Sequence, residues 1–373
     1  MDFSFTPEQE ALRDLARSIC QDHATHERLK AVEGAPDVVD RDLWRALATA
    51  NLLGVAIPEA DGGSGLGLVE LCLVLEQLGA AVAPAPVWPS LVLAGLPLAQ
   101  FGSAAQRERW LRPLATGDAI LTAALMELPA EVPAAPTTMA VRDGSGWRLD
   151  GLKDCVPAAH VASAILVPAR TGDRDVGVFV VEPSAQGVRL ERQVATNREI
   201  QGRLTLDGVR VGADAVLGDP AQGAAIVAWL VDRAMLGLCA LELGVVERAV
   251  RITAQYAGER KQFDRPIGSF QAVQMRAADA WIDVESIRLT TWQAAWRLDA
   301  GLPASDAIRV AKFLAAEAGH RITYAAQHLH GGIGVDVDSP IHRYYLWSKM
   351  LELTLGSGAR QLAALGESIA AEG

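Results

Sequence analysis

The sequence contains no run of five or more basic residues, and its net charge is negative. It has 34 Lys and Arg against 45 Asp and Glu, which gives a formal net charge of −11. Proteins that bind nucleic acid or anionic membranes typically present clustered basic residues. We therefore expect neither nucleic acid nor an anionic membrane surface as the main partner.

Cysteine is also scarce. The four cysteines, Cys20, Cys72, Cys155 and Cys239, lie far apart, and no C-x-x-C pair or His/Cys cluster occurs. This spacing argues against a zinc site. Separated single cysteines suit reduced thiols, so a cytoplasmic location is expected. The N-terminal segment MDFSFTPEQEALRDLA is acidic and lacks the apolar core of a signal peptide.

One long segment, residues 78–106, carries no charge. Pro84, Pro86, Pro89 and Pro97 interrupt it, and prolines in this density break a continuous helix. The segment is therefore predicted to contain helix ends and a buried loop, and no membrane span.

Half of the 373 residues are hydrophobic, which allows a large core and predicts two or three domains or one large helical one. Residues 1–118 show helical spacing: Thr6-Pro7 predicts a capped helix start, and Asp42 is expected to cap a helix over 42–53. Between 119 and 218 the apolar runs are short and are separated by turn signals such as Asp207-Gly208. Such punctuation predicts an antiparallel β barrel or sandwich.

Long helical patterns return from residue 219 to the end. The segments 223–256, 271–298 and 303–329 are each long enough to favour an antiparallel bundle. The predicted fold is therefore mostly α with a central β domain. Its predicted domains are a helical domain over 1–118, a β domain over 119–218 and a helical bundle over 219–373.

Two segments of the last third could bind an anionic ligand. Gly331-Gly332-Ile333-Gly334 lets backbone amides approach a phosphate, although glycines also commonly end helices. Residues 259–268 read ERKQFDRPIG and are followed by Phe270 and Gln271. This cationic turn with an aromatic ring suits a dinucleotide, or it simply complements a helix dipole.

A third feature is Glu242, the one charged residue in the stretch 235–246. Its helical neighbours three and four residues away include Leu238 and Val246, and none of these neighbours can pair with a carboxylate. Burial without a partner should raise its pKa, which suits a general base. The alternative is a glutamate whose partner lies on another element.

Several blocks of sequence occur in an order that is characteristic of one family. These blocks are FTPEQEALRDLAR at 5–17, IPE at 57–59, FGSAAQRERWLRPLATGDA at 101–119, GLK at 151–153, GVRVGADAVLG at 208–218, ERKQFDRPIGSFQAVQ at 259–274, AKFLAAEAG at 311–319 and QHLHGGIGVDVDSPIHRYY at 327–345. With them the chain resembles acyl-CoA dehydrogenases from end to end.

The resemblance implies a helical domain, a small β domain and a C-terminal four-helix bundle, assembled into a homo- or hetero-oligomer such as a tetramer. It also implies FAD as cofactor, α,β-desaturation of an acyl-CoA thioester, and an electron-transfer flavoprotein as electron acceptor. The residues expected to contact the adenine-diphosphate half of FAD held mainly by a neighbouring subunit are Arg260, Gln262, Phe263 and Gln271, with Gln327, Gly331 and Gly332 on the same side.

The sequence departs from the family at the catalytic base. Family members place a glutamate either late, at the position of Leu355, or early in the first bundle helix, near Ala234. Neither residue here is a carboxylate. Glu242, about two turns beyond Ala234, is chosen by elimination, with Glu352 as the weaker candidate.

The β domain departs too. The family segments that hold the flavin ring through Thr and Ser side chains appear here as residues 125–130, LMELPA, and residues 155–160, CVPAAH. The pattern is similar to members that desaturate sterol side-chain CoA thioesters, some of which assemble from two different chains. Alternatives to desaturation by this chain are therefore a non-catalytic subunit that completes a sister chain's FAD site, or a flavin oxidase or monooxygenase on the same scaffold.

Overall fold

The computed structural model describes residues 4–128, 132–173 and 175–372. The chain divides into two compact units, and the division falls within two helices. The first unit contains residues 1–29, 68–83 and 235–373, and the second contains residues 30–67 and 84–234. The domain limits 118/119 and 218/219 remain a prediction.

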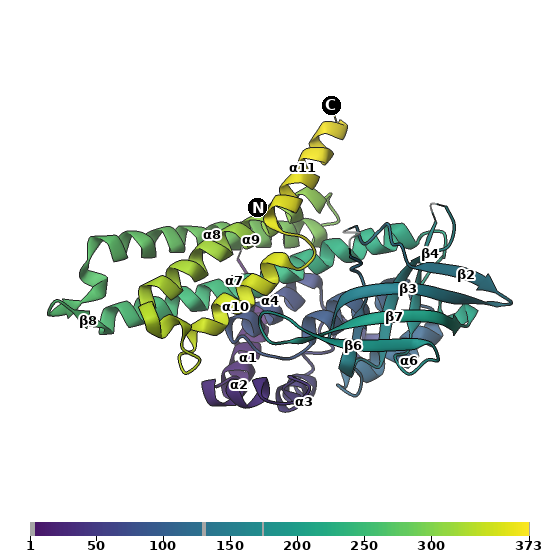
Figure 1. Ribbon diagram of the computed structural model, residues 1–373, viewed down its shortest axis with the longest axis horizontal. Coiled ribbons are helices and arrows are strands. Elements are labelled where there is room, and N and C mark those ends of the chain that lie inside the picture. Colours follow the sequence, from purple (N-terminus) through teal and green to yellow (C-terminus); the bar gives the residue numbers. More distant parts are fainter. Residues whose placement is uncertain (1–3, 129–131, 174, 373) are drawn as a thin grey trace. The chain divides into compact units, whose positions relative to one another are not determined.

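The helices of the first unit are long, and several pack against one another (Figure 1). They are α1 (Pro7–His23), α4 (Leu68–Ala80), α8 (Gln271–Asp299), α9 (Ser305–His330), α10 (Ile341–Leu353) and α11 (Gly358–Glu372), together with the start of α2 (His26–Glu33) and most of α7 (Gly223–Glu259). The hairpin β8 (Lys261–Gln262) and β9 (Arg265–Pro266), η5 (Ile267–Ser269) and η6 (Gly331–Val335) belong to it as well.

The expected start of α1 is confirmed. The Thr6 hydroxyl accepts from the Gln9 amide while the Gln9 side chain accepts from the Thr6 amide, which satisfies two amides that the helix itself leaves free. The cap expected at Asp42 is wrong, because Asp40 caps α3 (Arg41–Thr49) by accepting from the amides of Asp42 and Leu43. Asp40 lies two residues before Asp42, and it takes the capping role because the helix begins at Arg41.

Helices α4 and α7 cross at closest approach through two glycines. A Cβ at Gly79 would collide with the backbone of Leu241, and a Cβ at Gly244 would collide with the carbonyl oxygen of Glu76. Only glycine lets the two backbones meet there. Helix α7 is long and apolar enough to cross a membrane, but 61% of its most apolar window is buried within the described chain, as in a core helix.

The second unit contains a seven-stranded sheet and the remaining helices. Its strands are β1 (Leu121–Ala123), β2 (Met139–Asp143), β3 (Gly146–Pro157), β4 (Ala164–Arg170), β5 (Val176–Val181), β6 (Val188–Val194) and β7 (Ile200–Val211). They lie in the order β1-β4-β2-β3-β7-β6, and β5 also pairs with β4. The sheet is mostly antiparallel as predicted, except that β4 runs parallel to β1 and β2.

The expected turn at Asp207-Gly208 lies inside β7, where the pairing with β3 shifts register. Gly208 has a φ of 64°, so it makes a bulge rather than a hairpin. The sheet packs around a core in which the rings of Trp147 and Phe179 meet edge to face at 5.3 Å.

The uncharged segment 78–106 contains the expected helix ends and buried loop: α4 ends at Ala80, and residues 81–86 form a largely buried connection before the next helix. It contains a π-helix, η2 (Trp88–Gly95), and α5 (Leu96–Phe101), with a proline at the start of each. Prolines are tolerated in a first helical turn because no amide is needed there. The rest of the second unit comprises η1 (Glu59–Asp61), α6 (Ala104–Ala115), η3 (Ala159–Val161) and η4 (Ala213–Ala215), with α3, the end of α2 and the start of α7.

Candidate functional site

The hairpin after α7 carries three of the predicted cofactor residues, Arg260, Gln262 and Phe263. Gln262 pairs with Arg265, so Phe263 and Asp264 alone form the loop. Both have positive φ, 55° and 64°, as a two-residue hairpin of type I′ requires, but neither is the glycine that usually relieves the strain. Phe263 is 87% exposed. The strained loop thus holds the apolar ring of Phe263 in water, which indicates that this ring contacts another molecule.

The glycine turn η6 exposes bare backbone. Gly331 has a φ of 65° and ends α9, and a Cβ on either Gly331 or Gly332 would meet nothing within 4 Å. Packing inside the chain therefore does not explain the glycine at 332. The side-chain amide of Gln327 donates to the carbonyl oxygen of Gly334 at 3.0 Å, which fixes the shape of the turn.

A stacked ring pair joins the hairpin to the glycine turn. Tyr256, one turn before Arg260, stacks on His330 with centroids 4.3 Å apart, and His330 directly precedes Gly331. The structure thus brings the hairpin and the turn to one end of the first unit. Gln271 is exposed as the first residue of α8, whose cap residue Phe270 has no side-chain acceptor.

Glu242 lies in the core of the first unit, with 2% of its surface exposed. One carboxylate oxygen accepts from the Ser348 hydroxyl at 2.6 Å, while the other is buried without a partner. Burial raises its pKa to about 8, although Ser348 and Lys312 act in the opposite direction. The raised pKa that the sequence predicts is therefore found, and so is a partner on another helix.

Space for this carboxylate comes from α9. A Cβ at Gly319 would collide with the Glu242 carboxylate, so glycine is required there for the group to fit. The ammonium of Lys312 is also buried and donates to the carbonyl oxygens of Leu351 and Glu352, at 2.7 and 3.0 Å. Backbone carbonyls at the end of α10 thus satisfy this lysine.

The weaker candidate, Glu352, is committed to an ion pair. Its carboxylate accepts from Lys349 at 2.5 Å and lies 3.8 Å from His320. The two positions at which the family places its base are apolar. Ala234 is buried, and its carbonyl oxygen accepts from the Trp88 indole at 3.1 Å; Leu355 lies in the turn after α10, with a φ of 58°.

The segment 155–160, expected beside the flavin ring, contains no residue with a hydroxyl group. Cys155 has a φ of 53° and lies at an irregularity of β3, where its amide donates to the side chain of Gln193. The neighbouring hydroxyl of Thr122 is already engaged, because it donates to the carbonyl oxygen of Pro157 at 2.7 Å. Of the other segment, 125–130, residues 129 and 130 lie outside the described residues.

Sequence reasoning missed a buried ion pair in the sheet. Lys153, fully buried, donates to Glu127 at 2.5 Å. Burial alone would raise the pKa of Glu127, but Lys153 and the hydroxyls of Thr137 and Thr138 lower it to about 2. The partners are 26 residues apart in the chain, so no local pattern indicates the pair.

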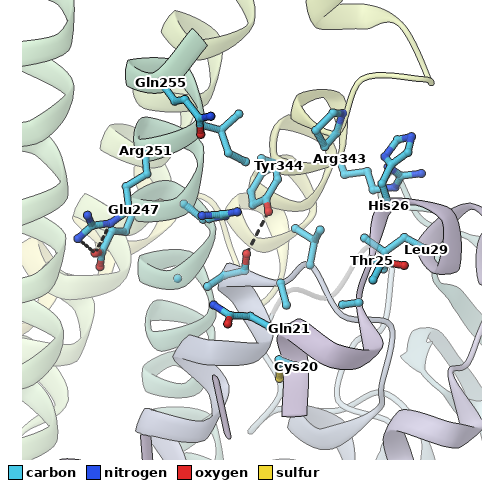
Figure 2. A pocket seen from close by; sticks show the side chains of 18 of the residues that line it. Cys20, Gln21, Thr25, His26, Leu29, Glu247, Arg251, Gln255, Arg343 and Tyr344 are labelled. Carbon is cyan, nitrogen blue, oxygen red and sulfur yellow. Dashed lines mark hydrogen bonds and ion pairs between the residues drawn. The ribbon is translucent and has the colours of Figure 1, made fainter. Parts of the chain in front are cut away.

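The first unit also contains a cavity of about 950 Å³. It is lined by α1, α4, the second half of α7, η6 and the start of α10 (Figure 2). None of the predicted site residues lines it, and neither does Glu242. The cavity shares Tyr256, Glu259 and His330 with the neighbourhood of the hairpin and the glycine turn.

Comparison with known proteins covers nearly the whole chain. Residues 6–118 match the family model described as "Acyl-CoA dehydrogenase, N-terminal domain", and residues 221–370 match "Acyl-CoA dehydrogenase, C-terminal domain". Acyl-CoA dehydrogenase FadE27 of Mycobacterium tuberculosis is 40% identical over 99% of both chains, and FadE28 of the same organism is 35% identical over 98% of both.

Two solved structures are similar throughout. A "Tcur3481-Tcur3483 steroid ACAD" variant superposes with a TM-score of 0.92 at 47% identity, covering 98% of each chain. The ChsE4-ChsE5 complex from Mycobacterium tuberculosis superposes with a TM-score of 0.94 at 41% identity, covering 99% of each chain. The predicted fold class is thereby confirmed.

Proposed function

Since the chain belongs to the acyl-CoA dehydrogenase family, we propose that it is one subunit of a heteromeric acyl-CoA dehydrogenase and completes the FAD site of a sister chain. The assembly desaturates an acyl-CoA thioester, with a sterol side chain as the acyl group, and passes electrons to an electron-transfer flavoprotein. When bound, FAD supplies the acceptor for the substrate's β-hydride. This chain contributes binding groups, and the sister chain contributes the base.

The observation that carries the proposal is that none of the four candidate positions for the base holds an accessible carboxylate. Glu242 is 2% exposed and does not line the cavity, Glu352 is held by Lys349, and the two family positions are Ala234 and Leu355. A general base must come within hydrogen-bond reach of the proton that it removes. A carboxylate closed inside a helical core cannot do so without opening the core.

The residues present fit one end of FAD and not the other. At the adenine end, Arg260 is exposed beside the exposed ring of Phe263, and the backbone of Gly331 and Gly332 faces open space. A guanidinium and an open glycine backbone suit the close approach of a pyrophosphate. At the ring end, the hydroxyl of Thr122 is already engaged. The chain would thus hold the diphosphate of a neighbour's FAD more readily than a flavin ring of its own.

The comparisons support two different chains. Two of the similar structures are named for pairs of proteins, ChsE4-ChsE5 and Tcur3481-Tcur3483, and the second is named as a steroid ACAD. Their identities of 41% and 47% over nearly the full length make the same kind of assembly a reasonable model for this chain.

A second candidate function is desaturation by this chain alone with Glu242 as base. The observation that favours it is the raised pKa of Glu242, about 8, which suits proton abstraction near neutral pH. This function would require the core around Ser348 to open when substrate binds.

The test is to purify the chain alone and together with candidate sister chains, and to measure FAD per chain and acyl-CoA-dependent dye reduction. We expect little FAD and no reduction from the chain alone, and activity with fewer FAD than chains in the heteromer. One FAD per chain with full activity in a homomer would refute the heteromer and favour the second candidate.

A variant tests the adenine end. Arg260→Ala should weaken FAD binding by the heteromer about tenfold or more, because a charge-assisted hydrogen bond typically contributes about 1.5–3 kcal/mol. Arg309→Ala is the matched control, since Arg309 pairs with Asp306 on α9, away from the hairpin. Equal FAD affinity in the two variants would remove Arg260 from the site.

A further inference from the structure

The 950 Å³ cavity of the first unit has the size of a small-molecule site. Its walls come from α1, α4, α7, η6 and α10, all within one compact unit. Figure 2 shows Gln255, Tyr344 and Gln21 among the side chains around it. Neither the FAD contacts proposed above nor either candidate base lines this space, so its chemistry is separate from theirs.

One wall is rich in guanidinium groups. Arg17 and Arg251 already pair with carboxylates of their own helices, Asp14 and Glu247. Arg248 makes no ion pair within the part of the chain that the structure describes; its side chain donates to the Tyr344 hydroxyl. The charge of Arg248 is thus left for a further anion.

A second arginine is fixed close by. Arg343 is 2% exposed, and one of its guanidinium nitrogens lies 2.9 Å from Nδ1 of His26, beside which Figure 2 shows it. A guanidinium held rigidly against a cavity needs little further ordering to bind an anion. Arg248 and Arg343 both line the cavity near Tyr344 and define its anion-binding end.

The floor of the cavity contains a buried carboxyl group without a hydrogen-bond donor. Glu76 on α4 is 7% exposed and lines the cavity. No described residue donates a hydrogen bond to it, although a buried polar group normally has a partner. The close crossing at Gly244 presses α7 against the backbone of Glu76. The guanidinium groups of Arg13, Arg17 and Arg288 act on its carboxyl group through their charge without a hydrogen bond, so a donor can come from the cavity that Glu76 lines.

A flat aromatic surface completes the lining. Tyr256 and His330 stack with an interplanar angle of 20° and both line the cavity. Stacked rings offer a face to a planar heterocycle. The cavity therefore combines an anion-binding end, an aromatic wall and a carboxyl acceptor.

We propose that this cavity binds a nucleoside monophosphate: its phosphate pairs with Arg248 and Arg343, its base packs against Tyr256, and an amino group of the base donates to Glu76. A phosphate alone would leave Glu76 without a donor, and a neutral nucleoside would leave Arg248 without an anion. The binding involves no covalent step.

The experiment measures AMP binding to the purified full-length chain by isothermal titration calorimetry, with adenosine and inorganic phosphate as separate ligands. We expect saturable binding of one AMP per chain, with both fragments at least about tenfold weaker, because each lacks one of the charged or hydrogen-bonded ends. Arg248→Ala should weaken AMP about tenfold or more. Glu76→Gln should weaken AMP and leave inorganic phosphate unchanged.

Two controls make the result specific. Arg309→Ala, at a half-buried position of α9 outside the cavity lining, should bind AMP like the wild type. Arg260→Ala should also keep AMP affinity while weakening FAD, which separates this site from the proposed FAD contacts. Circular dichroism melting of each variant confirms folding.

Three results would overturn the proposal. The first is the absence of saturable AMP binding at millimolar concentration. The second is loss of AMP binding in Arg260→Ala but not in Arg248→Ala. The third is equal affinity of the chain for AMP and for inorganic phosphate. The second result would assign the nucleotide to the FAD end and leave the heteromer proposal intact.

Discussion

Replacing Glu242 by glutamine tests whether this carboxyl group is a destabilising ionisable group of the core. The side chain is 2% exposed, and one of its two oxygens is buried without a partner. Glutamine has nearly the same shape and can still accept from Ser348. It resembles the protonated acid, so the substitution removes the charge and little else.

The magnitude follows from the pKa. Burial raises the pKa of Glu242 from 4.5 to about 8. Above pH 4.5 the unfolded chain releases this proton while the folded chain keeps it, so the folded state binds one more proton and its stability falls as pH rises. At about 1.4 kcal/mol per pH unit, this loss amounts to roughly 3 kcal/mol by pH 7 and levels off above pH 8.

The assay compares urea denaturation midpoints of the wild type and Glu242→Gln at pH 5, 6, 7 and 8, at one protein concentration because the protein is expected to be oligomeric. With each increase in pH, the free energy of unfolding of the variant should rise relative to that of the wild type. Glu108→Gln, at an exposed position of α6, is the control and should follow the wild type. Parallel pH profiles for wild type and Glu242→Gln would refute the reasoning.

Activity and stability measurements give four more predictions. If Glu242 is instead the base, Glu242→Gln in an active assembly should lower dye reduction at least roughly 10²–10⁴-fold with FAD retained; unchanged activity rules this out. Lys153→Met leaves Glu127 buried without its ion-pair partner and should cost about 3–5 kcal/mol in urea unfolding; a loss below about 1 kcal/mol would contradict the pairing. Asp40→Ala removes the cap of α3 and should cost about 0.5–2 kcal/mol, with no change expected for the exposed Asp42→Ala. Gly332→Ala should leave the melting temperature unchanged, because a Cβ there meets nothing, yet weaken FAD binding by the heteromer; equal FAD affinity would show that no cofactor approaches this backbone.

Local patterns predicted most of the secondary structure. The long helices α7, α8 and α9 begin and end within a few residues of the predicted segments, because helical spacing repeated over many turns leaves little ambiguity. Strand β6 has a weaker sequence signal than the long helices. Its residues alternate between exposed and half-buried without a buried face, so the usual apolar alternation is missing.

Some site residues could likewise be identified from local sequence, and others only from the tertiary structure. The hairpin at Phe263 and the glycine turn at Gly331 are local motifs, and the sequence alone identified both as candidates. The sequence also indicated a raised pKa for Glu242 from its apolar helical neighbours. The Ser348 partner was invisible in the sequence because it lies 106 residues away on another helix.

The sequence by itself determined the order of helical and β segments, the family, and the candidate residues, since each depends on short-range spacing or on blocks of matching residues. Tertiary structure alone decided which of those residues are accessible. Whether a carboxylate faces a cavity depends on how helices cross, and here Gly79 and Gly244 let two helices approach closely. Backbones can meet as closely as at Gly79 and Gly244 only where no side chain stands between them, while the missing side chain at Gly319 leaves room for the carboxylate of Glu242. That packing closes the core over Glu242 and leaves Glu76 beside an open cavity.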